Sequence, residues 1–303
     1  MKPSSLRLPA LLALLLTLGA APPDRQSPLA AAAARAAPAG FSGKLRAVIV
    51  SSEDDGRLQS LGIPLSVPGI YPLVATAGAA TPMTAIVMTP FSAKVNGRIG
   101  HYQMGSWPNE DRAKAGAASA RAFAFAAARR QYGVPRGFIE VTHEATSTHV
   151  SESFTLGDFL THGQLDVWPK YIVLDLKMVD KLELLLDELR AEGHPVRHLT
   201  VMSGFRAPSY NAEGVGPGGR SAISRHMYGD AADVFPDDDR NGWTDDINHD
   251  GRVDLEDARV LLRAAEAVEA KYPDLVGGLG LYQSTSAHGP FLHVDTRGSR
   301  ARW

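Results

Sequence analysis

Three short segments in the second half of the chain combine histidine, aspartate or arginine with glycine or strand-forming residues. They are residues 203–206, 224–233 and 291–295. The first follows a predicted strand over 199–202, the second runs into a predicted strand over 231–235, and the third alternates as a strand does. Alternation places His293 and Asp295 on one face of the third segment. If these segments form one site, the fold has to bring them together on a small sheet.

The polar residues of these segments are of the types that bind zinc. A catalytic zinc ion takes three protein ligands and leaves a fourth place for water. The chain has no cysteine, so a zinc site here has to use histidine and carboxylate ligands. Gly229 and Ala231 allow a tight turn between His226 and Asp233, so that both can reach one ion. A lone histidine is usually an ordinary polar residue, but three such segments in a chain with 10 histidines make a specific pattern.

The spacing Ser224-x-His226-x-x-Gly229-x-Ala231-x-Asp233, with 203–206 before it and His293 after it, resembles the zinc D-alanyl-D-alanine carboxypeptidase family. That family includes D-Ala-D-Ala dipeptidases and phage endolysin peptidases, and it shares a fold with hedgehog signalling domains. The resemblance covers about residues 150–303, and the basic, Trp-ended tail is similar to one branch. It implies that His226, Asp233 and His293 are the zinc ligands. It also implies that Arg206 binds the substrate carboxylate or the scissile carbonyl oxygen; the alternative is a structural salt bridge to an aspartate.

The sequence departs from the family pattern at the general base. Many members carry a Glu three residues before the last ligand, or a His two or three before it, where this chain has Pro290 and Phe291. The remaining candidates are His288, Asp295 and Asp230. His288 lies in a glycine-bearing loop and is favoured, whereas Asp295 is also placed to orient a ligand from behind. Without the usual acid, a metal-binding protein that has lost catalysis remains an alternative.

A second metal-binding pattern lies between Asp233 and His293. Residues 246–257 match a calcium loop, with glycine at loop position 6 and an apolar residue at position 8. A helix is predicted over 255–270 but none before the loop, which resembles a dockerin-type loop–helix. Aspartate at position 12 predicts modest affinity, and the alternative is a solvated acidic turn. The predicted calcium ligands are Asp246, Asn248, Asp250, Arg252 (through its carbonyl), Asp254 and Asp257; Asp237, Asp239, Asn241 and Asp245 form a poorer loop upstream.

The N-terminus predicts export. Lys2 and Arg7 precede an apolar run over 8–18 and then small residues, which is typical of a secretory signal over residues 1–21. The run is shorter than the roughly 20 residues of a transmembrane helix, so no stable membrane span is expected after cleavage. The alternative is a buried N-terminal helix. Residues 22–40 are rich in alanine and proline and are predicted to be a tether, and the protein is expected in the periplasm or cell envelope.

The remaining pattern predicts an α+β fold. Residues 41–150 are predicted to form a β-rich accessory module with a tight turn at Asn96-Gly97 and a helix over 109–130. The resemblance implies that residues 151–303 form the zinc peptidase domain, a small antiparallel sheet with flanking helices, and the calcium-loop pattern adds an insert over 237–257. An amphipathic helix over 174–190 has apolar residues three and four apart, with its charged residues on the other side. Those charged residues are Asp180, Lys181, Glu183, Asp187 and Glu188.

The sequence therefore predicts an exported zinc peptidase that hydrolyses a D-Ala-containing bond in peptidoglycan, as a carboxypeptidase or an endopeptidase. The alternatives are a non-catalytic peptidoglycan-binding protein stabilised by zinc and calcium, and a calcium-dependent interaction protein. The formal net charge is −2 and there is no basic stripe with interleaved aromatics, so nucleic acid is not an expected partner. Nothing in the sequence indicates an oligomeric state.

Overall fold

A computed structural model describes residues 40–51, 66–73, 83–110, 132–217 and 219–303. The predicted signal peptide, nearly all of the tether and most of the helix predicted over 109–130 lie outside these residues. Within them the chain is mixed α+β, as predicted, with small sheets and few helices. No helix of the described part combines the length and the apolar character that crossing a bilayer requires.

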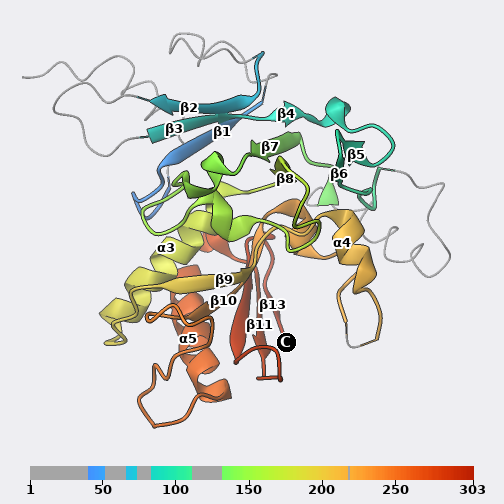
Figure 1. The fold of residues 1–303 in the computed structure, drawn as a ribbon. Coiled ribbons are helices and arrows are strands. Elements are labelled where there is room, and N and C mark those ends of the chain that lie inside the picture. Colours follow the sequence, from blue (N-terminus) through green and yellow to red (C-terminus); the bar gives the residue numbers. More distant parts are fainter. Residues whose placement is uncertain (1–39, 52–65, 74–82, 111–131, 218) are drawn as a thin grey trace, which may run out of the picture.

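A five-stranded sheet carries the segments that were singled out in the sequence (Figure 1). Its strand order is β13-β11-β12-β10-β9, and all neighbours are antiparallel except the pair β11 and β13. The strands predicted at 199–202, 231–235 and 291–295 are confirmed. The bounds are β9 (Leu199–Ser203), β10 (Ala231–Pro236), β11 (Gly278–Tyr282), β12 (Phe291–Asp295) and β13 (Ala301–Arg302).

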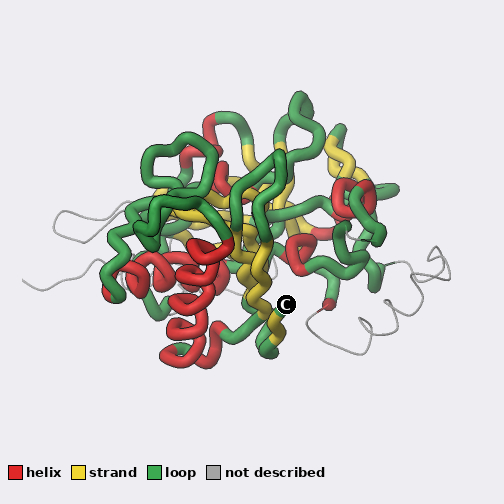
Figure 2. The backbone as a smooth tube through the Cα atoms, turned by 90° about the horizontal axis from the view of Figure 1, so that it is seen from below, coloured by secondary structure: helices red, strands yellow, loops and turns green. Residues whose placement is uncertain are grey.

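Two long helices, α3 (Leu176–Ala191) and α5 (Leu255–Lys271), lie side by side, and α5 packs on β11 and β12 (Figures 1 and 2). Asp175 caps α3 by accepting a hydrogen bond from the backbone N–H of Lys177. Asp254 caps α5 through a capping box. Both helices confirm the predictions from periodicity. A short helix, α4 (Pro208–Glu213), follows β9.

The sequence pattern predicted that the charged residues of α3 are exposed, but three of them are buried. Asp180 is 2% exposed, and Lys181 and Glu183 are 0% exposed. Asp180 accepts hydrogen bonds from the backbone N–H groups of Phe41 and Ser42, while Lys181 donates to Glu269 on α5. The helix is therefore covered by segments distant in sequence, and each buried charge has a partner there, as burial requires.

The N-terminal part forms three small sheets whose core continues into the rest of the molecule. The strand β7 pairs with β8 across the predicted boundary at residue 150, and Leu45 forms a bridge with Ser151. Buried apolar residues from both sides of that boundary belong to one core cluster. The sheet orders are β1-β3-β2, β4-β7-β8 and β5-β6. The strands are β1 (Ala47–Val50), β2 (Gly69–Leu73), β3 (Met83–Val87), β4 (Thr89–Pro90), β5 (Arg98–Ile99), β6 (Tyr102–Gln103), β7 (Gly137–Val141) and β8 (Lys170–Ile172).

The tight turn predicted at Asn96-Gly97 is confirmed. The φ angles of these residues are 51° and 75°, as a type I′ turn requires. Val95 and Arg98 exchange two backbone hydrogen bonds across the turn, with N···O distances of 2.8 and 2.9 Å.

Candidate metal centre

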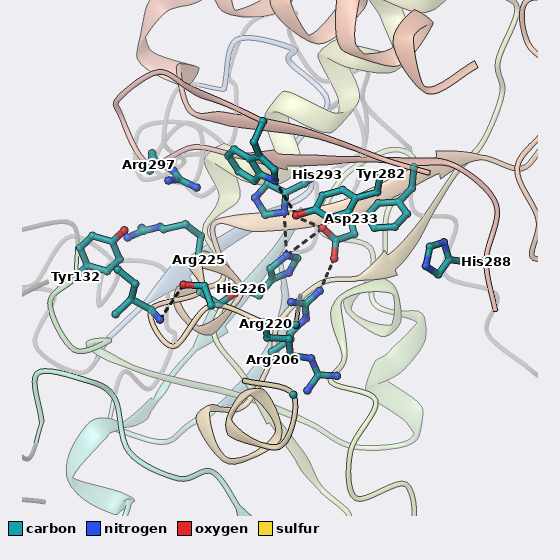
Figure 3. Close-up of a pocket in the computed structure, with 17 residues that line it drawn as sticks. Tyr132, Arg206, Arg220, Arg225, His226, Asp233, Tyr282, His288, His293 and Arg297 are labelled. Carbon is teal, nitrogen blue, oxygen red and sulfur yellow. Dashed lines mark hydrogen bonds and ion pairs between the residues drawn. The ribbon is translucent and has the colours of Figure 1, made fainter. Parts of the chain in front are cut away.

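Two neighbouring strands place Asp233 and His293 next to each other. Asp233 on β10 and His293 on β12 are register partners in the antiparallel pair, so their side chains emerge on the same face of the sheet. His226 comes from the 3₁₀ turn Arg225–Tyr228, which leads into β10. Figure 3 shows the three side chains pointing toward one another at one wall of a pocket. The structure thus brings together the three residues that the resemblance implied as ligands.

The three candidate ligand atoms lie within contact distance of one another. His226 Nε2 lies 3.2 Å from His293 Nδ1 and 3.3 Å from Asp233 Oδ1, and His293 Nδ1 lies 2.8 Å from the same oxygen. All three residues are buried: His226 is 2% exposed, Asp233 is 4% exposed and His293 is 7% exposed. In the described part of the chain, these three form the one group of metal-binding side chains whose ligand atoms lie within 4.8 Å of one another.

The hydrogen bonds behind the histidines fix which nitrogen faces the centre. His226 Nδ1 lies 2.8 Å from the carbonyl oxygen of Gly204, which can only accept, so Nδ1 carries the proton and Nε2 presents a lone pair. His293 Nε2 lies 3.2 Å from Asp295 Oδ2, which likewise leaves Nδ1 as the inward atom. Two nitrogen lone pairs and one carboxylate oxygen then face each other, an arrangement that needs a cation or a proton between them.

The spacing of these atoms fits a tetrahedral zinc ion. Zinc bonds to nitrogen and oxygen of about 2.0–2.1 Å give a tetrahedron whose ligands are about 3.3–3.4 Å apart. The two separations that involve His226 Nε2, 3.2 and 3.3 Å, are close to that edge. The separation of 2.8 Å between His293 and Asp233 is that of a hydrogen bond and has to open slightly. The donor set therefore suits a zinc ion.

The ionisation of the group matches this arrangement. Burial lowers the pKa of His226, which favours its neutral form. Burial alone would lower the pKa of His293, but hydrogen bonds to Asp233 and Asp295 raise it above its ordinary value. For Asp233, the two histidines outweigh the effect of burial and hold its pKa well below the ordinary value. These directions favour a proton on His293 beside the ionised Asp233.

Two glycines of the motifs are required by the backbone. Gly229 ends the 3₁₀ turn with φ +69°, and a Cβ there would lie 2.1 Å from the carbonyl oxygen of Val173. A Cβ on Gly204 would lie 2.6 Å from the Cα of Phe159. The tight turn expected between His226 and Asp233 is confirmed. At Gly229 the backbone packs closely on Val173, in the segment before α3.

Arg206 and Asp295 both touch the ligand group from outside. Arg206 donates to Ser203 Oγ at 2.8 Å and forms an ion pair with Asp233 Oδ2, leaving Oδ1 toward the histidines. This pair is the salt bridge to an aspartate that the sequence left open as an alternative. Asp295 is 0% exposed and also accepts from Gly278 N and pairs with Arg297. Asp295 therefore lies behind His293 and orients its ring.

The other two candidate bases lie apart from the ligand atoms. His288 lines the same pocket, but its ring packs on Phe291 at 5.0 Å and its Nδ1 lies 2.8 Å from the carbonyl oxygen of Gly289 (Figure 3). Asp230 is 5% exposed and pairs with Arg225. Burial raises the pKa of Asp230 to about 6. Of the three candidates, His288 is the one that lines the pocket.

The pocket beside the ligand group has a volume of about 740 Å³ and a cationic lining. Arg206, Arg220, Arg225 and Arg297 line it, and Asp233 is its one carboxylate among the described residues. Within those residues Arg220 has no carboxylate partner; it donates to the carbonyl oxygen of Tyr210 and lies 4.1 Å from that ring's centroid. The sequence did not single out Arg220, because nothing in the chain order shows that it lines the same pocket as His226.

The C-terminal tail also belongs to the pocket. The ring of Trp303 lies 5.2 Å from that of His293, and its Nε1 donates to the hydroxyl of Tyr282 at 2.8 Å. A Cβ on Gly280 would lie 2.4 Å from the Trp303 ring, so this glycine makes room for it. The Trp-ended tail was noted only as part of the resemblance; its place beside the metal centre depends on β13 pairing with β11.

No protein-family model, curated protein or solved structure matches this chain.

The predicted calcium loop over 246–257 is a compact turn at the start of α5. Asp246 Oδ2 accepts from Gly251 N at 2.9 Å, and Asp257 Oδ1 accepts from Ile247 N at 3.0 Å. Asp257 is 0% exposed. Unlike the candidate zinc ligands, the acids of this described loop do not form a group of three ligand atoms within 4.8 Å. A cation would have to draw them together.

Proposed function

We propose that the protein is a zinc-dependent peptidase of the D-alanyl-D-alanine carboxypeptidase family, with the fold shared by hedgehog domains, and that it hydrolyses a D-Ala-containing peptide bond in peptidoglycan. The observation that carries this proposal is the convergence of His226, Asp233 and His293 on one point at the wall of a cationic pocket. The resemblance of the three segments gives the reaction class. The signal-like N-terminus supports export to the periplasm or cell envelope.

His226, Asp233 and His293 would hold the zinc ion. Bound there, zinc would lower the pKa of a coordinated water to about 7 and polarise the scissile carbonyl. Asp295 and the carbonyl oxygen of Gly204 fix the rings of His293 and His226, so the ligand atoms are held in place before metal binds.

Arg206 is the residue placed to bind a substrate oxygen. Ser203 and Asp233 use two of its five N–H donors, so others remain for a carbonyl or carboxylate oxygen. A guanidinium beside the metal would stabilise the oxyanion that develops in the transition state. His288 is the proposed general base, because it lines the pocket while Asp295 is enclosed behind His293.

The pocket suits an acidic peptide. Arg206, Arg225 and Arg297 are paired with carboxylates, while Arg220 has no carboxylate partner among the described residues. Peptide substrates of a carboxypeptidase end in a carboxylate, and arginine binds carboxylates with two parallel hydrogen bonds. The charge of the pocket therefore favours a peptide with a free carboxylate close to the scissile bond.

Turnover on purified peptidoglycan tests the proposal. Zinc-loaded protein is incubated with sacculi, and the released or altered muropeptides are identified by mass spectrometry. We expect loss of D-Ala or of a crosslink, abolished by His293→Ala and reduced by Arg206→Ala. His288→Ala should lower kcat by about 10²- to 10⁴-fold with zinc content unchanged. Unchanged muropeptides with zinc-loaded wild type would contradict the proposal.

A non-catalytic peptidoglycan-binding protein is the second candidate. It is favoured by one observation: among the described residues, no acid or base side chain contacts the ligand atoms from the pocket side, since Asp295 lies behind His293 and His288 stands apart. Co-sedimentation with sacculi without any muropeptide change would support this candidate.

We also propose that residues 246–257 bind Ca²⁺ through Asp246, Asn248, Asp250, the carbonyl of Arg252, Asp254 and Asp257. The loop pattern carries this proposal. Calcium titration of the metal-free protein by calorimetry tests it, with Asp246→Asn expected to remove binding in this loop. An exported protein meets millimolar calcium, so modest affinity is sufficient.

A further inference from the structure

A buried carboxylate oxygen without a partner lies at the end of β10. Asp237 directly follows this strand and is 2% exposed. Its Oδ2 accepts hydrogen bonds from Thr200 Oγ1 at 2.8 Å and from Gly242 N at 3.2 Å. Its Oδ1 is buried and has no hydrogen-bond partner among the described residues. Leaving a charged oxygen buried and unsatisfied is costly, so this atom is a candidate ligand for a cation.

Further oxygen ligands stand around Asp237 at calcium-loop spacing. Counting Asp237 as position 1, positions 3, 5 and 9 are Asp239, Asn241 and Asp245, and position 6 is Gly242 with φ +79°. Burial raises the pKa of Asp245, and the nearby charges of Asp239 and Asp237 raise it further, so these carboxylates share one region. Their ligand atoms do not form a group of three within 4.8 Å, so a cation would have to draw them together.

Asp238, between these ligands, serves another purpose. Its Oδ1 accepts from the backbone N–H groups of Arg197 and His198, both at 2.8 Å, and its Oδ2 lies 3.1 Å from Arg197 Nε. Its own N–H donates to Asp245 Oδ2 at 2.6 Å. Asp238 thus anchors the loop to the segment before β9 and is not counted among the candidate ligands.

We propose that residues 237–245 form a second calcium site, with Asp237, Asp239, Asn241, Asp245 and the carbonyl of Trp243 as ligands, distinct from the 246–257 loop, and that it positions the zinc ligands. Hard oxygen donors of this number and kind suit Ca²⁺ rather than zinc. The cation would close the loop onto the unsatisfied oxygen of Asp237.

The loop is connected to both strands that carry the metal centre. Asp237 continues β10, which holds Asp233. Thr244 Oγ1 donates to the carbonyl oxygen of Pro290 at 2.7 Å, directly before β12 with His293. A Cβ on Gly289 would lie 2.5 Å from that hydroxyl, so the contact is close. Calcium bound to the loop therefore holds the entry of β12 against the end of β10.

Calcium stoichiometry tests the site, and it does not depend on peptidase activity. Equilibrium dialysis with ⁴⁵Ca²⁺ on the zinc-loaded full chain should give about two ions for the wild type and about one for Asp237→Asn. Asp239→Ala, at an exposed position, removes the ligand oxygens altogether and should lose the same ion without a folding defect. The matched control is Asp274→Asn, which is exposed and outside both loops, and it should keep about two. Wild-type stoichiometry in both loop variants overturns the site.

Terbium luminescence locates the ion. Trp243 lies within the loop, so Tb³⁺ in the site should show emission when tryptophan is excited. The emission should be displaced by Ca²⁺ and should fall in Asp237→Asn, which keeps only the ion of the 246–257 loop. Tryptophan-excited emission that persists unchanged in Asp237→Asn assigns it to another site and contradicts the proposal.

Zinc affinity tests the positioning role. We expect saturating Ca²⁺ to tighten zinc binding by about tenfold in the wild type, measured by competition with a zinc-selective dye. Thr244→Val should bind the same number of calcium ions but lose this coupling, because it keeps the ligands and removes the bond to Pro290. Equal zinc affinity with and without Ca²⁺ in the wild type overturns the positioning role even if calcium binds.

Discussion

His293 Nδ1 lies 2.8 Å from Asp233 Oδ1 across the β10–β12 pair, and each of these residues is held from its other side, by Asp295 and by Arg206 respectively. The contact joins two residues that are 60 positions apart in the sequence. Together with His226 they form a buried group of side chains whose ligand atoms could hold a metal ion. The predictions below follow from this set and from the buried charges around it.

The first prediction concerns metal content. His226→Ala and His293→Ala each remove one ligand, so bound zinc after dialysis should fall from about one ion per chain to near zero. His288→Ala is the matched control, because this residue lines the same pocket without touching the ligand atoms. Elemental analysis of the dialysed proteins measures the result. Loss of zinc from the control but not from the ligand variants would refute the assignment.

The second prediction concerns the residue behind His293. Asp295→Asn removes the charge that orients the ring and should weaken zinc binding by about 10- to 100-fold without abolishing it. Competition with a chelator gives the affinity. Asp166→Asn, an exposed change, should leave the affinity unaltered. If Asp295→Asn binds zinc as tightly as the wild type, the Asp295 carboxylate does not orient His293 for zinc binding.

The sheet and both long helices were predictable because their apolar residues recur at strand or helix spacing. The convergence of His226, Asp233 and His293 was predictable because the motif fixes the residues of three segments by local spacing. The burial of Asp180 and Lys181 was not, since their partners are Phe41 and Ser42 in one case and Glu269 in the other, all distant in sequence. From the sequence alone, a charged residue in a helix is predicted to be exposed, unless the segment that packs over it is known.

The third prediction concerns the buried pair between α3 and α5. Lys181 Nζ lies 2.7 Å from Glu269 Oε1, and burial lowers the pKa of this lysine. Lys181→Met leaves Glu269 with Arg302 as its remaining cation, so the free energy of unfolding should fall by about 3 kcal/mol. Lys177→Met on the exposed side of the same helix should change it by less than about 0.5 kcal/mol. Urea unfolding measures both, and equal effects would contradict the role of the pair.

The fourth prediction concerns pH. Burial raises the pKa of Asp230 from 3.8 to about 6, so the folded state favours the protonated form. The raised pKa stabilises the folded state, and this stabilisation is complete below about pH 3.8. It decreases by about 3 kcal/mol as the pH rises through about 6. In Asp230→Asn this part of the pH dependence should be missing. Urea unfolding between about pH 4 and pH 7 measures it; parallel curves for wild type and variant would refute it.

The composition of the pocket was the least predictable part. Arg220, Tyr282 and Trp303 line it from separate segments, and Trp303 reaches His293 only because β13 pairs with β11. Such proximity depends on strand order, which local spacing does not encode. The unsatisfied oxygen of Asp237 is also a property of packing: the loop pattern alone made 237–245 the poorer of the two calcium candidates.

The central claim is that one zinc ion binds between three side chains with a coordination place left open. Anomalous diffraction from zinc-loaded crystals at the zinc absorption edge tests it most directly. We predict a single strong peak about 2.0–2.1 Å from His226 Nε2, Asp233 Oδ1 and His293 Nδ1, with a water as the fourth ligand. A peak elsewhere, or none at this point in zinc-loaded protein, would contradict the claim.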